Sequence, residues 1–235
     1  MLAIERLEFA YDDNAAPMCF NLEVAAGEVL SLIGPSGSGK STLLHLVAGF
    51  LAARSGQIRI DDLPIESMPP GERPVSIVFQ QHNLFPHLDL YTNVAIGVEP
   101  SLRLDAGQAE SVRAALARLG LEQLQRRMPG ELSGGQRQRV ALARALVRQR
   151  KILLLDEAFA ALGPAMRAEL IELVRELVEE QGMVGLLVSH QPEDARIASA
   201  RTAFICDGQV AACAPTIELL ENSPLPELRE YLGSM

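Results

Sequence analysis

The segment GPSGSGKS, at residues 34–41, constrains the fold of this chain more than any other feature. A run of β-branched and aliphatic residues, 29–33, precedes this segment, and a helix-forming run, 42–48, follows it. Glycine allows backbone conformations that other residues avoid, so successive N–H groups of such a loop can turn toward one anion at the start of a helix. The pattern therefore predicts a strand, a phosphate-binding loop and a helix rather than an ordinary glycine-rich turn.

The residues of this loop have distinct expected roles. Lys40 adds a positive charge, and the hydroxyl of Ser41 can ligate a phosphate-bound Mg²⁺ because that ion prefers oxygen. The expected phosphate-binding residues are Gly34, Pro35, Ser36, Gly37, Ser38, Gly39, Lys40, Ser41 and Thr42.

A second pattern consists of two acidic residues after a buried strand. Asp156 and Glu157 follow the apolar run 152–155. Parallel strands usually present their catalytic residues at their carboxyl ends, so these carboxylates are expected beside the phosphate loop. Asp156 can hold Mg²⁺ through a water, and Glu157 can polarise the water that attacks a terminal phosphate. A strand followed by a plain acidic turn is the alternative.

A third pattern is LSGGQ, at residues 132–136. Ser133 is a favourable N-cap, and the two glycines after it expose backbone N–H groups at the start of a helix. The segment therefore predicts a second anion-binding helix start, with a simple helix cap as the alternative. The residues concerned are Ser133, Gly134, Gly135 and Gln136.

The order of these motifs resembles that of the ATP-binding cassette (ABC) ATPases of membrane transporters. The resemblance rests on GPSGSGKS, Val78-Phe79-Gln80, LSGGQ, LLLDE and Val188-Ser189-His190, and covers nearly the whole chain. It implies an α/β fold of the P-loop NTPase class, with an ABC-type nucleotide-binding domain that has an antiparallel β portion and a helical subdomain. It also implies ATP and Mg²⁺ as ligands, and a head-to-tail pair of copies. Each ATP would lie between the phosphate loop of one copy and residues 133–136 of the other.

The resemblance also gives roles to single residues. Tyr11 would stack on the adenine, Gln80 would reach Mg²⁺ and sense the γ-phosphate, and His190 would contact that phosphate and position the attacking water. By themselves, Tyr11 could be a strand-end aromatic residue and His190 a structural one. No catalytic role is expected for the other histidines, His45, His82 and His87.

The chain departs from the family at one position. ABC transport ATPases usually continue after the catalytic glutamate as Pro-x-Ser-Ala-Leu-Asp, whereas here residues 158–163 read AFAALG, so Gly163 replaces the aspartate. In the family, that aspartate helps to organise the dimer seam near the attacking water. We therefore expect ATP binding to be retained, and hydrolysis to be slower or the two sites to cooperate less.

The length of 235 residues fits one large α/β domain. Strands are expected at 4–10, 28–33, 57–60, 75–79, 152–155, 184–188 and 202–206. Residues 1–80 and 151–235 would form the nucleotide-binding core, about 81–150 would form the helical subdomain that carries LSGGQ, and the tail beyond Pro215 would be a short helical appendix.

Composition excludes several classes of protein. The net charge of −9, without clustered basic and aromatic residues, argues against a nucleic-acid partner. No apolar stretch approaches the roughly 20 residues needed to span a bilayer, and the N-terminus does not resemble a secretory signal. The three cysteines lack the spacing of a zinc site, so reduced buried thiols are expected.

Some segments resemble a particular group of proteins within this family. Residues 68–76, 83–85, 129–131 and 188–198 are similar to those of ATP-binding subunits of bacterial thiamine importers. This implies a transmembrane permease as partner, a periplasmic substrate-binding protein acting indirectly, and a peripheral location on the cytoplasmic face of the inner membrane. Importers of iron(III), polyamines or sulfate share much of the pattern and remain alternatives. A soluble ABC protein and a weakly hydrolysing ATP-binding switch are further alternatives.

The proline-punctuated segment 81–88 is rich in large apolar residues. In the family, this region meets a coupling helix of the membrane subunit, which predicts a docking surface. The alternative is that these apolar residues simply close the junction with the helical subdomain. The segment can also do both.

Overall fold

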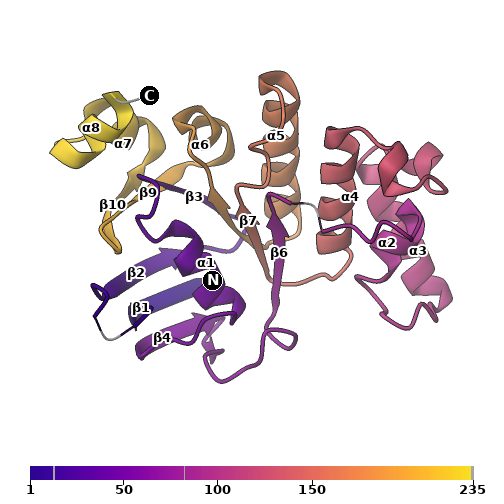
Figure 1. The fold of residues 1–235 in the computed structure, drawn as a ribbon, viewed down its shortest axis with the longest axis horizontal. Coiled ribbons are helices and arrows are strands. Elements are labelled where there is room, and N and C mark those ends of the chain that lie inside the picture. Colours follow the sequence, from indigo (N-terminus) through magenta and orange to yellow (C-terminus); the bar gives the residue numbers. More distant parts are fainter. Residues whose placement is uncertain (13, 82, 234–235) are drawn as a thin grey trace.

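The computed structural model describes residues 1–12, 14–81 and 83–233. Figure 1 shows a twisted mixed sheet with helices on both faces and a helical lobe at one side. The strands of the described chain, in their order across the sheet, are β5 (Leu63–Pro64), β4 (Ser55–Ile60), β1 (Leu2–Phe9), β2 (Met18–Val24), β10 (Gln209–Pro215), β9 (Arg201–Cys206), β3 (Val29–Ile33), β8 (Val184–Val188), β7 (Ile152–Asp156) and β6 (Val75–Phe79). The helices are α1 (Lys40–Ala48), α2 (Leu90–Ala95), α3 (Ala106–Arg118), α4 (Gly134–Leu146), α5 (Pro164–Glu180), α6 (Pro192–Ala198), α7 (Thr216–Asn222) and α8 (Pro226–Gly233), with 3₁₀ turns at Glu122–Leu124 and Pro129–Glu131.

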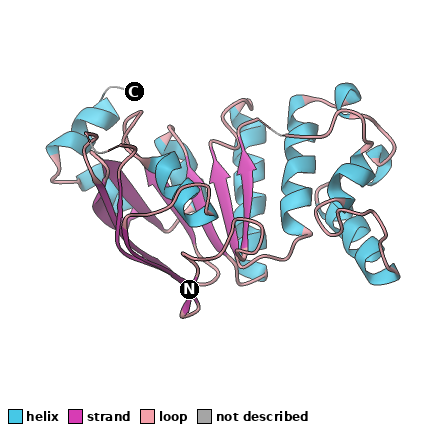
Figure 2. Cartoon of the chain, turned by 60° about the horizontal axis from the view of Figure 1, so that its bottom comes forward, coloured by secondary structure: helices cyan, strands magenta, loops and turns pink. Residues whose placement is uncertain are grey.

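Five parallel strands, β9, β3, β8, β7 and β6, form the centre of the sheet. Figure 2 shows these strands between helices. On β7, Ile152 and Leu154 pack toward α1, whereas Leu153 and Leu155 pack toward α5. Because both faces are covered, the strand is apolar throughout, which is why a continuous apolar run predicted it. All the strands predicted for this centre are confirmed, with small shifts of their ends.

The predicted antiparallel portion is also present. Strand β1 pairs with β2 and β4, and β4 forms a hairpin with β5. Asp61 and Asp62 make the turn of this hairpin with φ angles of 48° and 66°. Aspartate tolerates this left-handed conformation better than most residues, which favours a turn at this position.

Sequence analysis missed β2, β5 and β10. In β2 the buried side chains are Phe20, Leu22 and Val24, every second residue, so an alternating pattern was present in the sequence. Strand β10 pairs with β9 in an antiparallel hairpin and joins the core to β2 through the pairing of Gln209 with Cys19. This junction makes the two portions one sheet.

The helical lobe contains α2, α3 and α4 (Figure 1). All three helices lie within residues 81–150, the predicted helical subdomain, although no separate helix was predicted at α2. Asp105 caps α3 through reciprocal hydrogen bonds with Gln108, and Pro129 and Gly130 form the 3₁₀ turn that interrupts the helices. One apolar cluster continues from β7 and α5 into all three lobe helices, so the lobe is packed against the core.

The tail beyond Pro215 forms α7 and α8, as predicted for a helical appendix. Leu219, Leu228 and Tyr231 of these helices pack against Ile33 and Phe204 at the ends of β3 and β9. Cys19, Cys206 and Cys213 are free, but they are half-buried rather than buried. No helix among the described residues has the length and apolar character needed to cross a bilayer.

Candidate active site

The phosphate loop connects β3 to α1 and has the backbone that its sequence predicted. Gly34, Gly37 and Gly39 have φ angles of 147°, 79° and 106°. A Cβ atom on Gly34 would lie 2.0 Å from the carbonyl oxygen of Ile205, so no larger residue fits there. Pro35, Ser36 and Gly37 are exposed, whereas Ser38 and Gly39 are buried. The loop therefore has a buried base and an open rim at the start of a helix.

The ammonium group of Lys40 lies inside this loop. Its Nζ atom donates to the carbonyl oxygens of Gly34 at 2.8 Å and Pro35 at 2.7 Å. Burial lowers the pKa of Lys40, while the carboxylates of Glu157 and Asp156 act in the opposite direction. A phosphate entering the loop would meet a half-desolvated positive charge, whose attraction is stronger than that of a charge in bulk water.

The donors around Ser41 fit a magnesium ion that arrives with a nucleotide. The Oγ atom of Ser41 donates to Oδ1 of Asp156 at 2.8 Å. Both residues line a hollow of about 370 Å³ together with Gln80 and Glu157. A hydroxyl, a carboxylate and an amide oxygen suit Mg²⁺, which keeps several waters and takes phosphate oxygens as further ligands. Among the described residues, no three acidic, histidine or cysteine side chains are arranged so that they could hold a metal ion by themselves.

Glu157 lies just beyond the end of β7 in a left-handed conformation, with φ of 49°. Such a conformation is strained for glutamate and is found most often at functional sites. The N–H of Glu157 donates to the carbonyl oxygen of Val188 at 3.2 Å. Its Oε1 atom lies 2.6 Å from Nε2 of His190. The ends of β7 and β8 thus bring the two predicted catalytic side chains into contact.

Tyr11 lies beside the start of α1. Its side chain is 63% exposed, and its hydroxyl lies 2.8 Å from Oγ1 of Thr42. The ring of Phe9 packs edge-on against that of Tyr11, with 4.9 Å between the centroids. The ring is therefore held at a fixed place near the loop with most of its surface open, which suits the predicted stacking on adenine. That role stays a prediction.

The LSGGQ segment begins α4 with a reciprocal cap. The Oγ atom of Ser133 accepts from the N–H of Gln136 at 3.3 Å, and Oε1 of Gln136 accepts from the N–H of Ser133 at 2.9 Å. Gly134 is exposed, but Gly135 is covered by Met166. Figure 1 places α4 in the helical lobe, across β6 and β7 from α1. One copy therefore presents its two anion-binding helix starts at separate places.

The family model for ABC transporters matches residues 19–160. This range exceeds half of the chain and contains the phosphate loop, Gln80, LSGGQ and the Asp156–Glu157 pair. The chain belongs to the ABC transporter family. The family predicted from the motifs is confirmed, and with it the class of ATP-hydrolysing transport ATPases.

Several curated relatives match nearly the whole length of this ABC ATPase. The thiamine import ATP-binding protein of Cereibacter sphaeroides is 52% identical over 233 residues, 99% of this chain and 100% of the relative. Those of Escherichia coli and Brucella suis biovar 1 are 50% and 47% identical, covering 94% and 100% of this chain and 95% and 96% of the relatives.

Solved structures confirm the fold. A nucleotide-free ATP-binding cassette from an ABC transporter has a TM-score of 0.87 at 25% identity, covering 98% of both chains. A dimeric ATP-binding cassette in a post-hydrolysis state, bound to ADP and Pi, has a TM-score of 0.79 at 29% identity and covers 92% of this chain and 99% of its own.

Two site residues of this ABC ATPase were not predicted. Arg167 of α5 donates through Nη2 to the carbonyl oxygens of Leu162 at 2.9 Å and Ala160 at 3.3 Å. Its Nη1 atom lies 3.9 Å from Oδ1 of Asp194, whose Oδ2 accepts from the hydroxyl of Ser189 at 2.5 Å. Burial raises the pKa of Asp194, and the Ser189 hydrogen bond and Arg167 oppose the rise. A buried ion pair thus links the loop after Glu157 to the residue before His190.

Further expectations concern the other histidines and Gly163. His45, for which no catalytic role was expected, has Nε2 3.8 Å from Oδ2 of Asp156 and packs against the rings of Phe50 and Phe79. His87 lies in the turn before α2, whereas His82 is outside the described residues. Gly163 is the N-cap of α5 without a side-chain hydrogen bond, and a Cβ atom there would meet nothing within 4 Å.

Proposed function

We propose that this chain is the ATP-hydrolysing subunit of a bacterial importer for thiamine or its phosphates. Two copies would act on the cytoplasmic face of the inner membrane beneath a separate permease. The observation that carries the enzymatic part is the meeting of Lys40, Ser41 and Asp156 with the Glu157–His190 pair at one edge of the sheet. The cargo is supported by full-length relatives, 47% and 52% identical, that are named for thiamine import.

The geometry suits attack of water on the γ-phosphorus of ATP. Glu157 would accept a proton as the water oxygen bonds to phosphorus, and the bond to the bridging oxygen would break with its electrons leaving on ADP. Lys40 and the loop N–H groups would hold the phosphate oxygens, and Mg²⁺, held by Ser41, Gln80 and Asp156, would neutralise part of their charge. His190 would orient the Glu157 carboxylate and contact the γ-phosphate from the other side.

A head-to-tail pair would complete each site. Ser133 and Gly134 are exposed at the positive end of α4, which makes them available to a triphosphate bound to another copy. Because the ligand would contact both copies, ATP would hold the pair together and its hydrolysis would release it.

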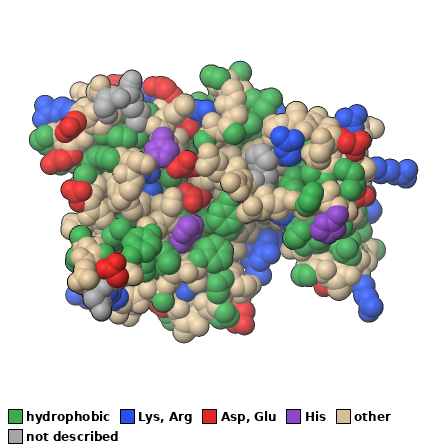
Figure 3. Space-filling view, in the orientation of Figure 1, with side chains coloured by type: hydrophobic (Ala, Val, Ile, Leu, Met, Phe, Trp, Pro, Cys, Tyr) green, Lys and Arg blue, Asp and Glu red, His purple; other side chains and the backbone are tan. Residues whose placement is uncertain are grey.

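A groove between the core and the helical lobe supports a permease partner. The groove has a volume of about 440 Å³ and is lined by Phe50, Phe85, Ile96 and Arg144, among others. Phe50 and Phe85 are 51% and 41% exposed, and the Arg144 guanidinium lies 5.9 Å from the centre of the Phe85 ring. Figure 3 shows the molecule hollowed between its two lobes. The region that follows Gln80 would seat an apolar helix of the permease, so phosphate occupancy could be transmitted to the membrane.

A weakly hydrolysing ATP switch is the second candidate, and Gly163 favours it. Measuring the ATPase activity of the purified chain with and without its permease distinguishes the importer motor from the switch. Turnover that rises on reconstitution supports the importer motor, whereas ATP binding with negligible turnover in both states supports the switch.

Uptake into proteoliposomes tests the cargo. Vesicles that hold the permease, this chain and internal ATP should accumulate labelled thiamine when the binding protein is added outside. Accumulation of iron(III), a polyamine or sulfate in place of thiamine would overturn the cargo, and Glu157→Gln vesicles control for leakage.

A further inference from the structure

The C-terminal helix α8 places a tyrosine hydroxyl next to the proposed active site. Tyr231 is 8% exposed, and its hydroxyl donates to the backbone carbonyl oxygen of His190 at 3.2 Å. Burial raises the pKa of Tyr231, and the backbone of Gly34 acts against the rise. The neutral hydroxyl is therefore favoured, which suits its role as donor to His190.

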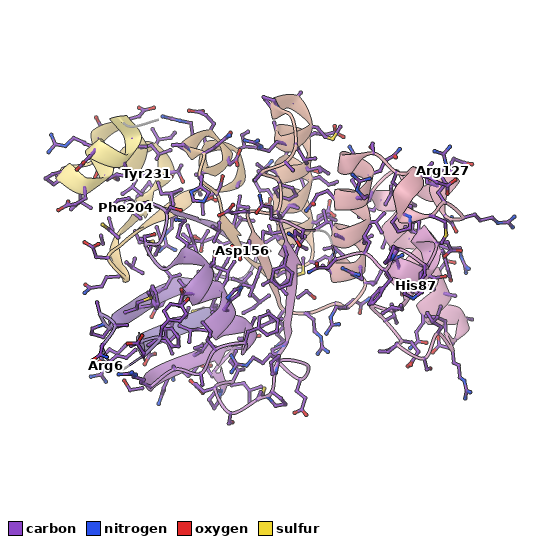
Figure 4. All side chains as sticks on the ribbon, in the orientation of Figure 1. Arg6, His87, Arg127, Asp156, Phe204 and Tyr231 are labelled. Atoms are coloured by element: carbon purple, nitrogen blue, oxygen red, sulfur yellow. The ribbon has the colours of Figure 1, made fainter. Side chains whose placement is uncertain are left out.

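Packing fixes the position of this hydroxyl. The ring centroid of Tyr231 lies 5.8 Å from that of Phe204 on β9, and both belong to a buried cluster with Ile33, Ala195 and Leu228. Figure 4 shows Tyr231 and Phe204 close together. The contacts come from β3, β9, α6 and α8, so the ring is held by the sheet as well as by its own helix.

The backbone carbonyl group of His190 lies just beyond the end of β8. Strands β3 and β8 pair in parallel up to Leu32 and Val188, after which the chains diverge into the phosphate loop and toward His190. Diverging backbones cannot continue the ladder, so this carbonyl group accepts its hydrogen bond from a side chain instead. The Nε2 atom of the His190 imidazole lies 2.6 Å from Oε1 of Glu157.

We propose that Tyr231 is a positioning residue for ATP hydrolysis, which fixes the backbone of His190 and so holds the imidazole against Glu157. This inference rests on the proposed role of His190. It gives the C-terminal appendix a part in positioning the site.

The test is Tyr231→Phe, which keeps the ring and removes the hydroxyl. The expected result is a decrease of about fivefold in kcat, the effect of one ordinary hydrogen bond, with the KM for ATP changed by less than about twofold. Leu232→Ala is the matched control, because Leu232 lies on the same helix and packs against the same cluster. It should lower the melting temperature and leave kcat unchanged. An equal decrease of kcat in both variants, or none in Tyr231→Phe, would overturn the proposal.

A double-mutant cycle with His190→Ala separates this inference from the proposed function. Because Tyr231 would act through His190, Tyr231→Phe should cost little further turnover in the His190→Ala background, measured in single turnovers. Full activity of His190→Ala would refute the assignment of His190 itself. A loss in His190→Ala together with additive effects of the two changes would refute only the role of Tyr231.

The distance between Nε2 of His190 and Oε1 of Glu157, 2.6 Å in the unmodified chain, gives a readout that needs no activity. This distance should lengthen in a crystal structure of Tyr231→Phe and stay the same in one of Leu232→Ala. An unchanged distance in Tyr231→Phe would contradict the proposal.

Discussion

The Nε2 atom of His190 lies 2.6 Å from Oε1 of Glu157, although the two residues are 33 positions apart in the chain. The contact exists because β7 and β8 are parallel neighbours that end together, with Asp156 paired to Val188. Each strand then turns its next residues toward the same edge of the sheet. A proposed general base and its partner are therefore placed by strand register.

We expect Glu157→Gln to abolish turnover while ATP still binds. An amide cannot accept the proton of the attacking water, so kcat should fall by at least about 100-fold. The variant should also accumulate ATP-bound dimers, measured by size-exclusion chromatography with Mg²⁺ and ATP. Glu180→Gln is the control, since Glu180 pairs with Arg118 on the surface. Rapid hydrolysis by Glu157→Gln would show that another group is the base.

Lys40→Ala should weaken ATP binding by about 10- to 100-fold, because it removes a charged donor to the phosphates. The chain offers an unusually close control, since Lys151 is its only other lysine. Lys151 forms an exposed ion pair with Asp61, and Lys151→Ala should leave nucleotide affinity unchanged. Equal affinities of both variants, measured by calorimetry, would argue against the role of the loop.

ATP binding should depend on pH through Lys40. Burial lowers the pKa of this lysine, and a bound triphosphate would favour its charged form and raise the pKa again. ATP binding should therefore take up protons at pH values between the pKa of Lys40 in the free protein and its higher pKa with ATP bound. The affinity for ATP should fall as the pH rises through the pKa of the free protein. Calorimetry in buffers of different ionisation enthalpy measures the uptake. Lys40→Arg should show none in this range, because arginine stays charged.

Gly163→Asp should fit without strain and stabilise the protein. Gly163 has φ of −65° and ψ of 156°, which any residue can adopt, and it caps α5 without a side-chain hydrogen bond. An aspartate would supply that bond, worth a few tenths of a kcal/mol over glycine, and would restore the usual family residue. Turnover with the permease should rise. Gly163→Ala, which adds a methyl group that cannot cap the helix, should raise neither the stability nor the turnover. No gain in Gly163→Asp turnover would mean that this position does not limit the rate.

Arg167→Met should destabilise the protein strongly, by about 3 kcal/mol, because it leaves Asp194 buried without its partner. The double change Arg167→Met with Asp194→Leu should recover much of this stability in thermal unfolding. It should not recover kcat, since the carbonyl oxygens of Ala160 and Leu162 would still lack their donor. Recovery of both the stability and the kcat would show that the ion pair has only a structural role.

Local sequence was sufficient for the parts of the site that are made from one segment. The φ angles of Gly34, Gly37 and Gly39, the reciprocal cap of Ser133 with Gln136 and the central strands all follow from residues adjacent in the chain. Strand β2 was missed even though its alternation was readable, because its apolar run is short and interrupted. Helix α2 has only six residues, too few for a clear helical period.

The long-range contacts were not readable in the same way. Arg167 lies three and four positions before Leu170 and Ile171, on the buried face of α5, although its charge by itself favours exposure. The sequence did not show that two carbonyl oxygens and Asp194 would be its partners there. Tyr231 lies in a tail that resembles an appendix, and only its packing on Phe204 brings its hydroxyl to His190.

The sequence by itself determined the candidate chemical groups of this protein: a phosphate loop, a candidate magnesium ligand, a candidate base and a second candidate anion-binding helix start, each encoded within a few neighbouring residues. The tertiary structure decided which of these groups meet and what supports them. The physical reason is that side-chain type and local backbone preference depend on adjacent residues. The 2.6 Å contact of Glu157 with His190 and the hydrogen bond from Tyr231 to His190 depend instead on strand register and on packing between segments far apart in the chain.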